Sequence, residues 1–199
     1  MKKYLIIPMV IFAINAFGQD AKPKKAIYFD PFLRAAIIYP IQFGDNSLNN
    51  SHRANQGFEF KASLFHFRNF KFGAGLNTVG YTVTDFFSIG NIGHTEYTSV
   101  FGDLTYDFFT IKKTTLSVDA GYGFVRMQQK VEGGNSALQD GGEFRVGTYV
   151  DYRVMKRFSA TLGAHYIGSN FKIETTKEYE DYFGKASKLQ LTLGLKMNF

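Results

Sequence analysis

The chain has 199 residues, the length of one domain, and contains no Cys and no Trp but 22 Phe, 12 Tyr and 20 Gly. The absence of Cys excludes disulfides, thiol nucleophiles, Fe–S clusters and cysteine zinc sites. A formal net charge of +6, 45% hydrophobic residues and a mean hydropathy of −0.15 would by themselves suggest an ordinary soluble domain. The order of the residues along the chain contradicts that impression.

The N-terminus has the organisation of an export signal. A basic start precedes an apolar stretch over residues 4–12, and small residues lead up to Gly18, which stands directly before Gln19 as the −1 residue of a cleavage site. The apolar stretch is too short to span a bilayer. We therefore expect a cleavable signal peptide over 1–18, followed by a short basic periplasmic lead over 19–25. The absence of Cys after the site excludes a lipoprotein anchor.

The rest of the chain alternates apolar and polar residues with a period of two, which predicts strands with one face of each kind. In the last strand Leu189, Leu191 and Leu193 share one face, and Lys188 and Lys196 lie on the other. Runs of this kind mark eight candidate strands, over 28–39, 54–67, 71–84, 95–109, 114–127, 142–154, 158–171 and 187–199. Three tight turns alternate with four longer connections, which is typical of an up-and-down transmembrane barrel.

The expected fold class is therefore all-β, an eight-stranded antiparallel up-and-down transmembrane β-barrel over 26–199. A soluble lipocalin-like barrel would show the same alternation, but with its apolar side chains inside. The charges on the polar face decide between the two, because a basic residue facing lipid at the midplane costs about 2–4 kcal/mol. Eight strands enclose a space that side chains just fill. We therefore expect a side-chain-filled polar lumen and no open pore.

Twelve charged residues on the polar face are expected to pair with one another inside the barrel as a structural network. They are Arg34, Glu59, Lys61, Asp103, Asp107, Asp119, Glu143, Arg145, Asp151, Arg153, Lys188 and Lys196. Pro31 interrupts the first run, so we expect that strand to start later or to carry a bulge there. Phe65, Phe67 and Phe101 also fall on the polar face, and a bulge or a position at the rim would account for them.

The charges outside the strands sort by end. Counted with Lys71 and Glu96 at the adjoining strand ends, the tight turns and the N-terminal lead carry nine bases against one acid, whereas the long connections carry nine acids against five bases. A basic rim of this kind suits anionic headgroups, so we expect outer-membrane lipid and lipopolysaccharide as partners of the barrel, and no nucleic acid. A membrane-complex or extracellular protein partner would bind through the connections 40–53, 85–94, 128–141 and 172–186.

A cleavable signal, eight amphipathic strands and a last strand that carries Leu195 and Met197 and ends at Phe199 resemble the small outer-membrane barrels of Gram-negative bacteria, the OmpA/OmpX type. Gln19 after the cleavage site and the many Gly-aromatic strands also resemble the outer membrane protein β-barrel families of Bacteroidetes. The resemblance implies an outer-membrane location with both termini in the periplasm. It also implies that Leu195, Met197 and Phe199 are the signal that the barrel-assembly machinery recognises.

The sequence leaves the biological task open. We expect a structural, surface-interaction or membrane-complex accessory role, without enzymatic activity, metal or cofactor. One alternative is a lipid-modifying barrel enzyme that would use His165 and Ser169. The lipid A deacylases that such an enzyme would resemble have the motif His-x-Ser-Asn, which the spacing of His165 and Ser169 does not match. The other alternative is a narrow pore or a conduit for hydrophobic molecules.

Overall fold

The computed structural model describes residues 27–90, 92–131, 134, 136–173 and 175–199. The predicted signal peptide with its cleavage site between Gly18 and Gln19, and the basic lead over 19–25, lie outside these residues.

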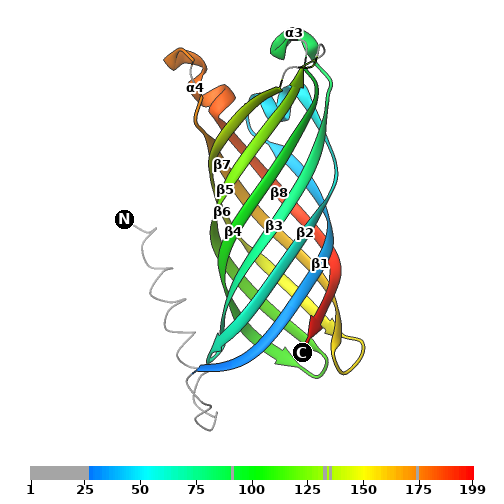
Figure 1. Cartoon of the computed structure of the whole chain (residues 1–199). Helices are drawn as coiled ribbons and strands as arrows, with labels where there is room; N and C mark the ends of the chain where they lie inside the picture. The colour runs from blue at the N-terminus through cyan, green and yellow to red at the C-terminus, as the bar shows by residue number, and fades with distance from the viewer. Residues whose placement is uncertain (1–26, 91, 132–133, 135, 174) are drawn as a thin grey trace, which may run out of the picture.

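Eight antiparallel strands form a closed barrel, in which each strand pairs with its neighbours in the sequence and the first pairs with the last (Figure 1). This confirms the predicted fold class. The strands are β1 (Ile27–Phe43), β2 (His52–Phe67), β3 (Phe70–Val83), β4 (Ile92–Ile111), β5 (Thr114–Val131), β6 (Ser136–Arg153), β7 (Phe158–Phe171) and β8 (Lys185–Asn198).

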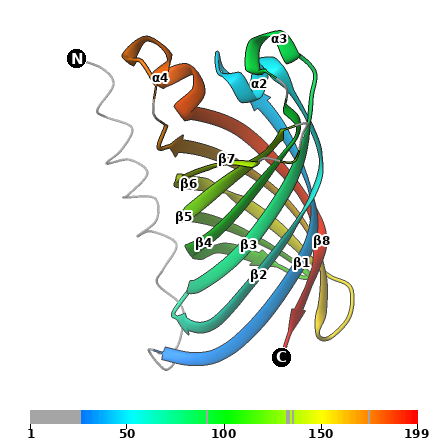
Figure 2. The same ribbon diagram turned by 45° about the horizontal axis from the view of Figure 1, so that its top comes forward.

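The two ends of the barrel differ. One end, which we call the turn end, holds the β2–β3, β4–β5 and β6–β7 turns and the C-terminus (Figure 1). Arg68 and Lys112 begin two of these turns with positive φ, as short hairpin turns require. The other end, the loop end, carries the helices α2 (Ser47–Ser51), α3 (Phe86–Ile89) and α4 (Lys177–Gly184). There α2 contacts both α3 and α4 (Figure 2).

The strands are longer at the loop end than the sequence indicated, so the predicted connections are too long. Within the predicted connection 128–141, β5 and β6 stay paired as far as Lys130 opposite Ser136. Similarly, Pro40 lies inside β1 opposite Gln190. The predicted connections 85–94 and 172–186 contain α3 and α4. In β5 and β6 the residues beyond the apolar band are mostly polar on both faces, so their alternation weakens. In β1 the alternation continues through Ile41 and Phe43, and it was Pro40 that suggested an earlier end.

The predicted irregularities have two different outcomes. The pairing of β1 with β2 shifts between Phe29 and Phe32, which confirms a bulge at Pro31. A second shift, after Ser63, turns the following residues over, so that Phe65 is 52% and Phe67 38% exposed on the outer wall. For Phe101 the expectation of a bulge or a rim position is wrong. Its ring lies in the lumen and is 2% exposed.

Polar and apolar side chains are arranged inside out relative to a soluble barrel. Outward positions carry exposed apolar side chains such as Phe60, Val100 and Leu193, whereas Arg145 and Glu59 on the inner face are buried. A lipocalin-like barrel would have the opposite arrangement. No helix among the described residues is long and apolar enough to cross a membrane.

Glycines on the inner face allow large lumen side chains to pass. A Cβ at Gly147 would collide with the carbonyl oxygen of Ala164 and the ring of His165, whereas a Cβ on the outer wall at Gly102 would meet nothing closer than 3.9 Å. We therefore expect Gly147→Ala to lower the free energy of unfolding by about 1–3 kcal/mol, the usual range for overpacking. Gly102→Ala is the matched control. Urea titration of the folded, heat-modifiable gel band checks both, and equal midpoints would contradict the prediction.

Candidate functional site

The inner face of the barrel holds a continuous set of ion pairs and hydrogen bonds. Closest to the turn end, Asp151 accepts hydrogen bonds from Lys196 at 2.8 Å, from Arg34 at 3.2 Å and from Thr161 at 2.6 Å. These four residues come from β6, β8, β1 and β7. Two cations thus share one carboxylate on the floor of the lumen.

A second pair lies on the opposite side of the same end. Lys71 Nζ is 2.5 Å from Asp107, which also accepts a hydrogen bond from Ser117 at 2.8 Å. The ring of Phe32 lies between the two groups, with the ammonium of Lys196 4.7 Å and that of Lys71 5.9 Å from its centroid. An aromatic face attracts cations at such distances.

The middle of the lumen has two carboxylates around one lysine. Lys61 pairs with Asp103 and, at 3.0 Å, with Asp119, and it donates to Thr105 at 3.0 Å. Asp119 also contacts Nε2 of His165 at 2.9 Å. Removing one partner of a buried ion pair leaves an uncompensated charge, which is strongly destabilising. The ion pairs of this group therefore hold its side chains in place across the middle of the lumen.

Above it, Glu59 is bound from three sides. It accepts from Arg145 at 2.7 Å, from the Tyr149 hydroxyl at 2.8 Å and from Gln190 at 2.9 Å. The guanidinium of Arg145 is stacked 3.6 Å from the centroid of Phe101. The buried ring of Phe101 therefore stabilises a charged group, because it stacks on the face of the Arg145 guanidinium.

Glu143 is the centre of a further polar group, which lies nearer the loop end than the group around Glu59. It accepts hydrogen bonds from Tyr97 at 2.5 Å and from Ser99 at 2.6 Å, and the Tyr97 hydroxyl is also 2.7 Å from the hydroxyl of Ser169. The ammonium of Lys188 lies 3.3 Å from the centroid of Tyr97 and finds no hydrogen-bond partner among the described residues.

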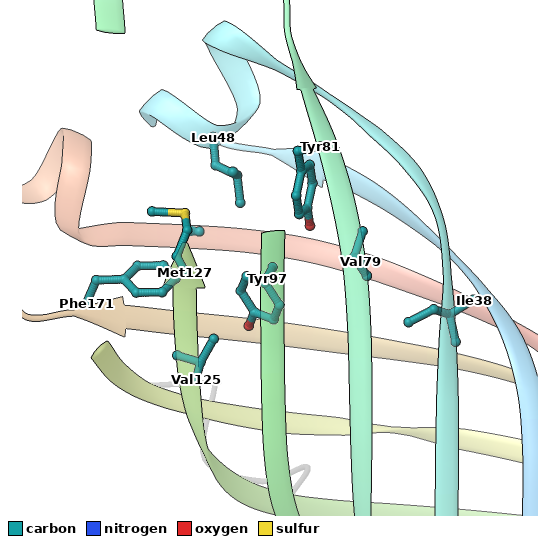
Figure 3. Packing of buried hydrophobic residues seen from close by; sticks show 9 residues of the cluster. Ile38, Leu48, Val79, Tyr81, Tyr97, Val125, Met127 and Phe171 are labelled. Atoms are coloured by element: carbon teal, nitrogen blue, oxygen red, sulfur yellow. The ribbon is translucent and has the colours of Figure 1, made fainter. Parts of the chain in front are cut away.

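An apolar cluster fills the inner face between this group and the loop end (Figure 3). Leu48 of α2 reaches down onto it from above. The cluster consists of Ile38, Leu48, Val79, Tyr81, Tyr97, Val125, Met127, Phe171 and Ala186. The sequence analysis expected a polar lumen and missed it. The available signal was the succession of Gly121 and Gly123 by the larger Val125 and Met127 on one face of β5.

Ten of the twelve residues assigned to the lumen network are buried. Asp107 is half-buried, in its pair with Lys71. Arg153 is the exception: it is exposed and forms no ion pair with any described residue, because β6 ends there at the mouth of the lumen. Lys71, which the sequence analysis assigned to the basic rim, belongs to the network instead.

The residues of the predicted assembly signal lie on β8 and directly after it. Leu195 and Phe199 are exposed on the outer wall and Met197 is half-buried. Their recognition by assembly machinery stays a prediction.

His165 and Ser169 both point into the lumen, each bound to another residue. The first contacts Asp119 and the second Tyr97. Four residues along one strand separate them by about 13 Å, at roughly 3.3 Å per residue. Among the described residues, no group of three or more His, Asp or Glu side chains could hold a metal ion.

No family model and no curated protein matches the sequence. Solved structures do match. Neisserial surface protein A has a TM-score of 0.61 at 17% identity, over 88% of this chain and 100% of that one. The outer membrane protein OprG of Pseudomonas aeruginosa has 0.57 at 10%, over 86% and 96%. The outer membrane protein AlkL, solved in lipid bilayers, has 0.55 at 13%, over 92% and 95%.

The chain has the fold of a small outer-membrane β-barrel. This agrees with the OmpA/OmpX-type resemblance of the sequence. At these identities the matches establish the fold alone. The likeness to Bacteroidetes families stays a prediction.

The network predicts that breaking a buried ion pair lowers folding stability much more than breaking an exposed one. Glu59→Gln leaves Arg145 with only its longer contact to Glu143, at 3.9 Å, and breaking a buried pair in this way costs about 3–5 kcal/mol of folding stability. Adding Arg145→Met to Glu59→Gln removes the poorly compensated buried charge, so we expect part of the loss to be recovered.

The matched control is Asp140→Asn, which breaks the exposed pair with Arg126. We expect its urea midpoint to equal that of the wild type. A loss as large as that of Glu59→Gln would contradict a stabilising role that depends on burial.

Proposed function

We propose that this protein is an integral outer-membrane barrel of a Gram-negative bacterium whose loop end faces the cell exterior and binds a partner there. In this proposal it acts as a structural or surface-interaction protein, or as an accessory of a membrane complex, and neither as a general porin nor as an enzyme. The apolar outer wall and the fold of the matching structures support the membrane location.

The observation that carries the proposal is the filling of the lumen. Ion pairs centred on Asp151, Asp119 and Glu59 cross it one above the other, and the apolar cluster with Leu48 lies over them. An eight-stranded barrel leaves little space beyond its own side chains. A filled lumen favours a role in which the protein binds a partner at its surface over one in which it conducts solutes.

The loop end has the features of an interaction surface. In α3, Phe86 is half exposed and Phe87 fully exposed, and in α4 the half-exposed Tyr179 stands between Glu178 and Glu180. Aromatic side chains are enriched in protein interfaces. A contiguous exposed apolar patch is unusual on a surface that binds no partner. An extracellular protein surface with basic residues would complement the acidic α4.

The proposed closure is tested by conductance. We expect purified protein in a planar bilayer to give no current above that of the protein-free bilayer, because side chains occupy the lumen. A general porin in the same bilayer is the positive control. Regular conductance steps from this protein would contradict the closed barrel.

The proposed orientation is tested by labelling, because the chain contains no Cys. Phe87→Cys places a thiol in α3 and Arg157→Cys places one in the β6–β7 turn, both at exposed positions. We expect a membrane-impermeant maleimide to label Phe87→Cys on intact cells, and Arg157→Cys only after the outer membrane is permeabilised. The reverse result would place the turn end outside.

A further inference from the structure

The lumen opens at the turn end into a polar pocket of about 360 Å³. Five cations line it, and we call them together the basic mouth: Lys71, Lys113, Arg153, Lys156 and Lys196. Three carboxylates line the same pocket, those of Asp30, Asp107 and Asp151. Five cations and three carboxylates leave an excess of two positive charges.

All three carboxylates are already engaged by other groups. Asp107 lies 2.5 Å from Lys71, and Asp151 lies 2.8 Å from Lys196 and also binds Arg34. Asp30 is 3.3 Å from His66. The two buried lysines of the floor thus have partners, and the pocket has no further carboxylate to offer to the other cations that line it.

The remaining cations, Lys113, Arg153 and Lys156, form no ion pair with any described residue. The fold nevertheless holds two of them together, because the backbone N–H of Arg153 donates to the carbonyl oxygen of Lys113 at 2.7 Å. Three like charges that line one opening repel one another, and an anion bound among them would relieve that repulsion.

We propose that the basic mouth is a binding site for a phosphate group. Arg153 offers a planar set of donors that fits two oxygens of one phosphate, and Lys113 and Lys156 supply single ammonium donors from the neighbouring turns. A doubly charged phosphate matches the excess of two positive charges, whereas one carboxylate would leave half of it.

Two sources could supply such a phosphate if the turn end is periplasmic, as the proposed function has it. One is the headgroup of a phospholipid in the adjoining leaflet, and the other is a soluble phosphorylated molecule of the periplasm. The binding test below is done in micelles, so it is independent of the orientation that the maleimide labelling reports.

The full chain in a neutral detergent is titrated with tripolyphosphate by isothermal calorimetry at low ionic strength. We expect one site per barrel, with an affinity that falls as salt is added. The triple variant Lys113→Gln/Arg153→Gln/Lys156→Gln should weaken binding at least tenfold. The matched control is Lys130→Gln/Lys172→Gln/Lys177→Gln, which removes the same charge from the loop end and should bind like the wild type.

Equal weakening in both triple variants would overturn the proposal, because it would show a general charge effect, and so would an unchanged affinity in the mouth variant. Binding of a tricarboxylate as tight as that of tripolyphosphate would overturn the preference for phosphate. In nanodiscs, competition by phosphatidylglycerol that phosphatidylcholine does not show supports the headgroup as the source. Binding that is the same in both lipids supports a soluble phosphate.

Discussion

Closure of the sheet is the constraint on which the rest of this structure depends. Twelve residue pairs join β1 to β8, from Phe32 opposite Asn198 to Phe43 opposite Ser187, and leave no free edge in the barrel. In a hydrocarbon layer every backbone N–H and C=O must be bonded within the protein, so a sheet satisfies them all only when it is closed. Closure with eight strands also fixes a narrow lumen, and the narrow lumen decides what its side chains must do.

In that lumen the charged side chains are buried, and most of them pair with one another. Asp119 binds Lys61 and His165, and Glu59 binds Arg145 together with Tyr149 and Gln190. Each group joins strands that are distant in the sequence. The same pairs that neutralise the interior therefore also fix the barrel in one shape.

The two ends of the barrel differ in what covers the lumen. At the loop end Leu48 and the apolar cluster cover the polar groups, and the aromatic residues of α3 and α4 remain exposed. At the turn end the lumen stays open to a polar pocket that Lys113, Arg153 and Lys156 line without an ion pair to any described residue. One end offers apolar and acidic surface and the other a concentration of positive charge.

The sequence by itself determined the strands, their inside-out arrangement and the membership of ten buried charges in the lumen, because a period of two and the cost of charge in lipid act residue by residue. Only the tertiary structure decided which charges meet. Arg34 and Asp151 are 117 residues apart, and their contact depends on how strands around the barrel face each other across the lumen. The apolar cluster and the place of Phe101 were likewise decided by neighbours on other strands, since alternation assigns a side chain to a face but not to a partner.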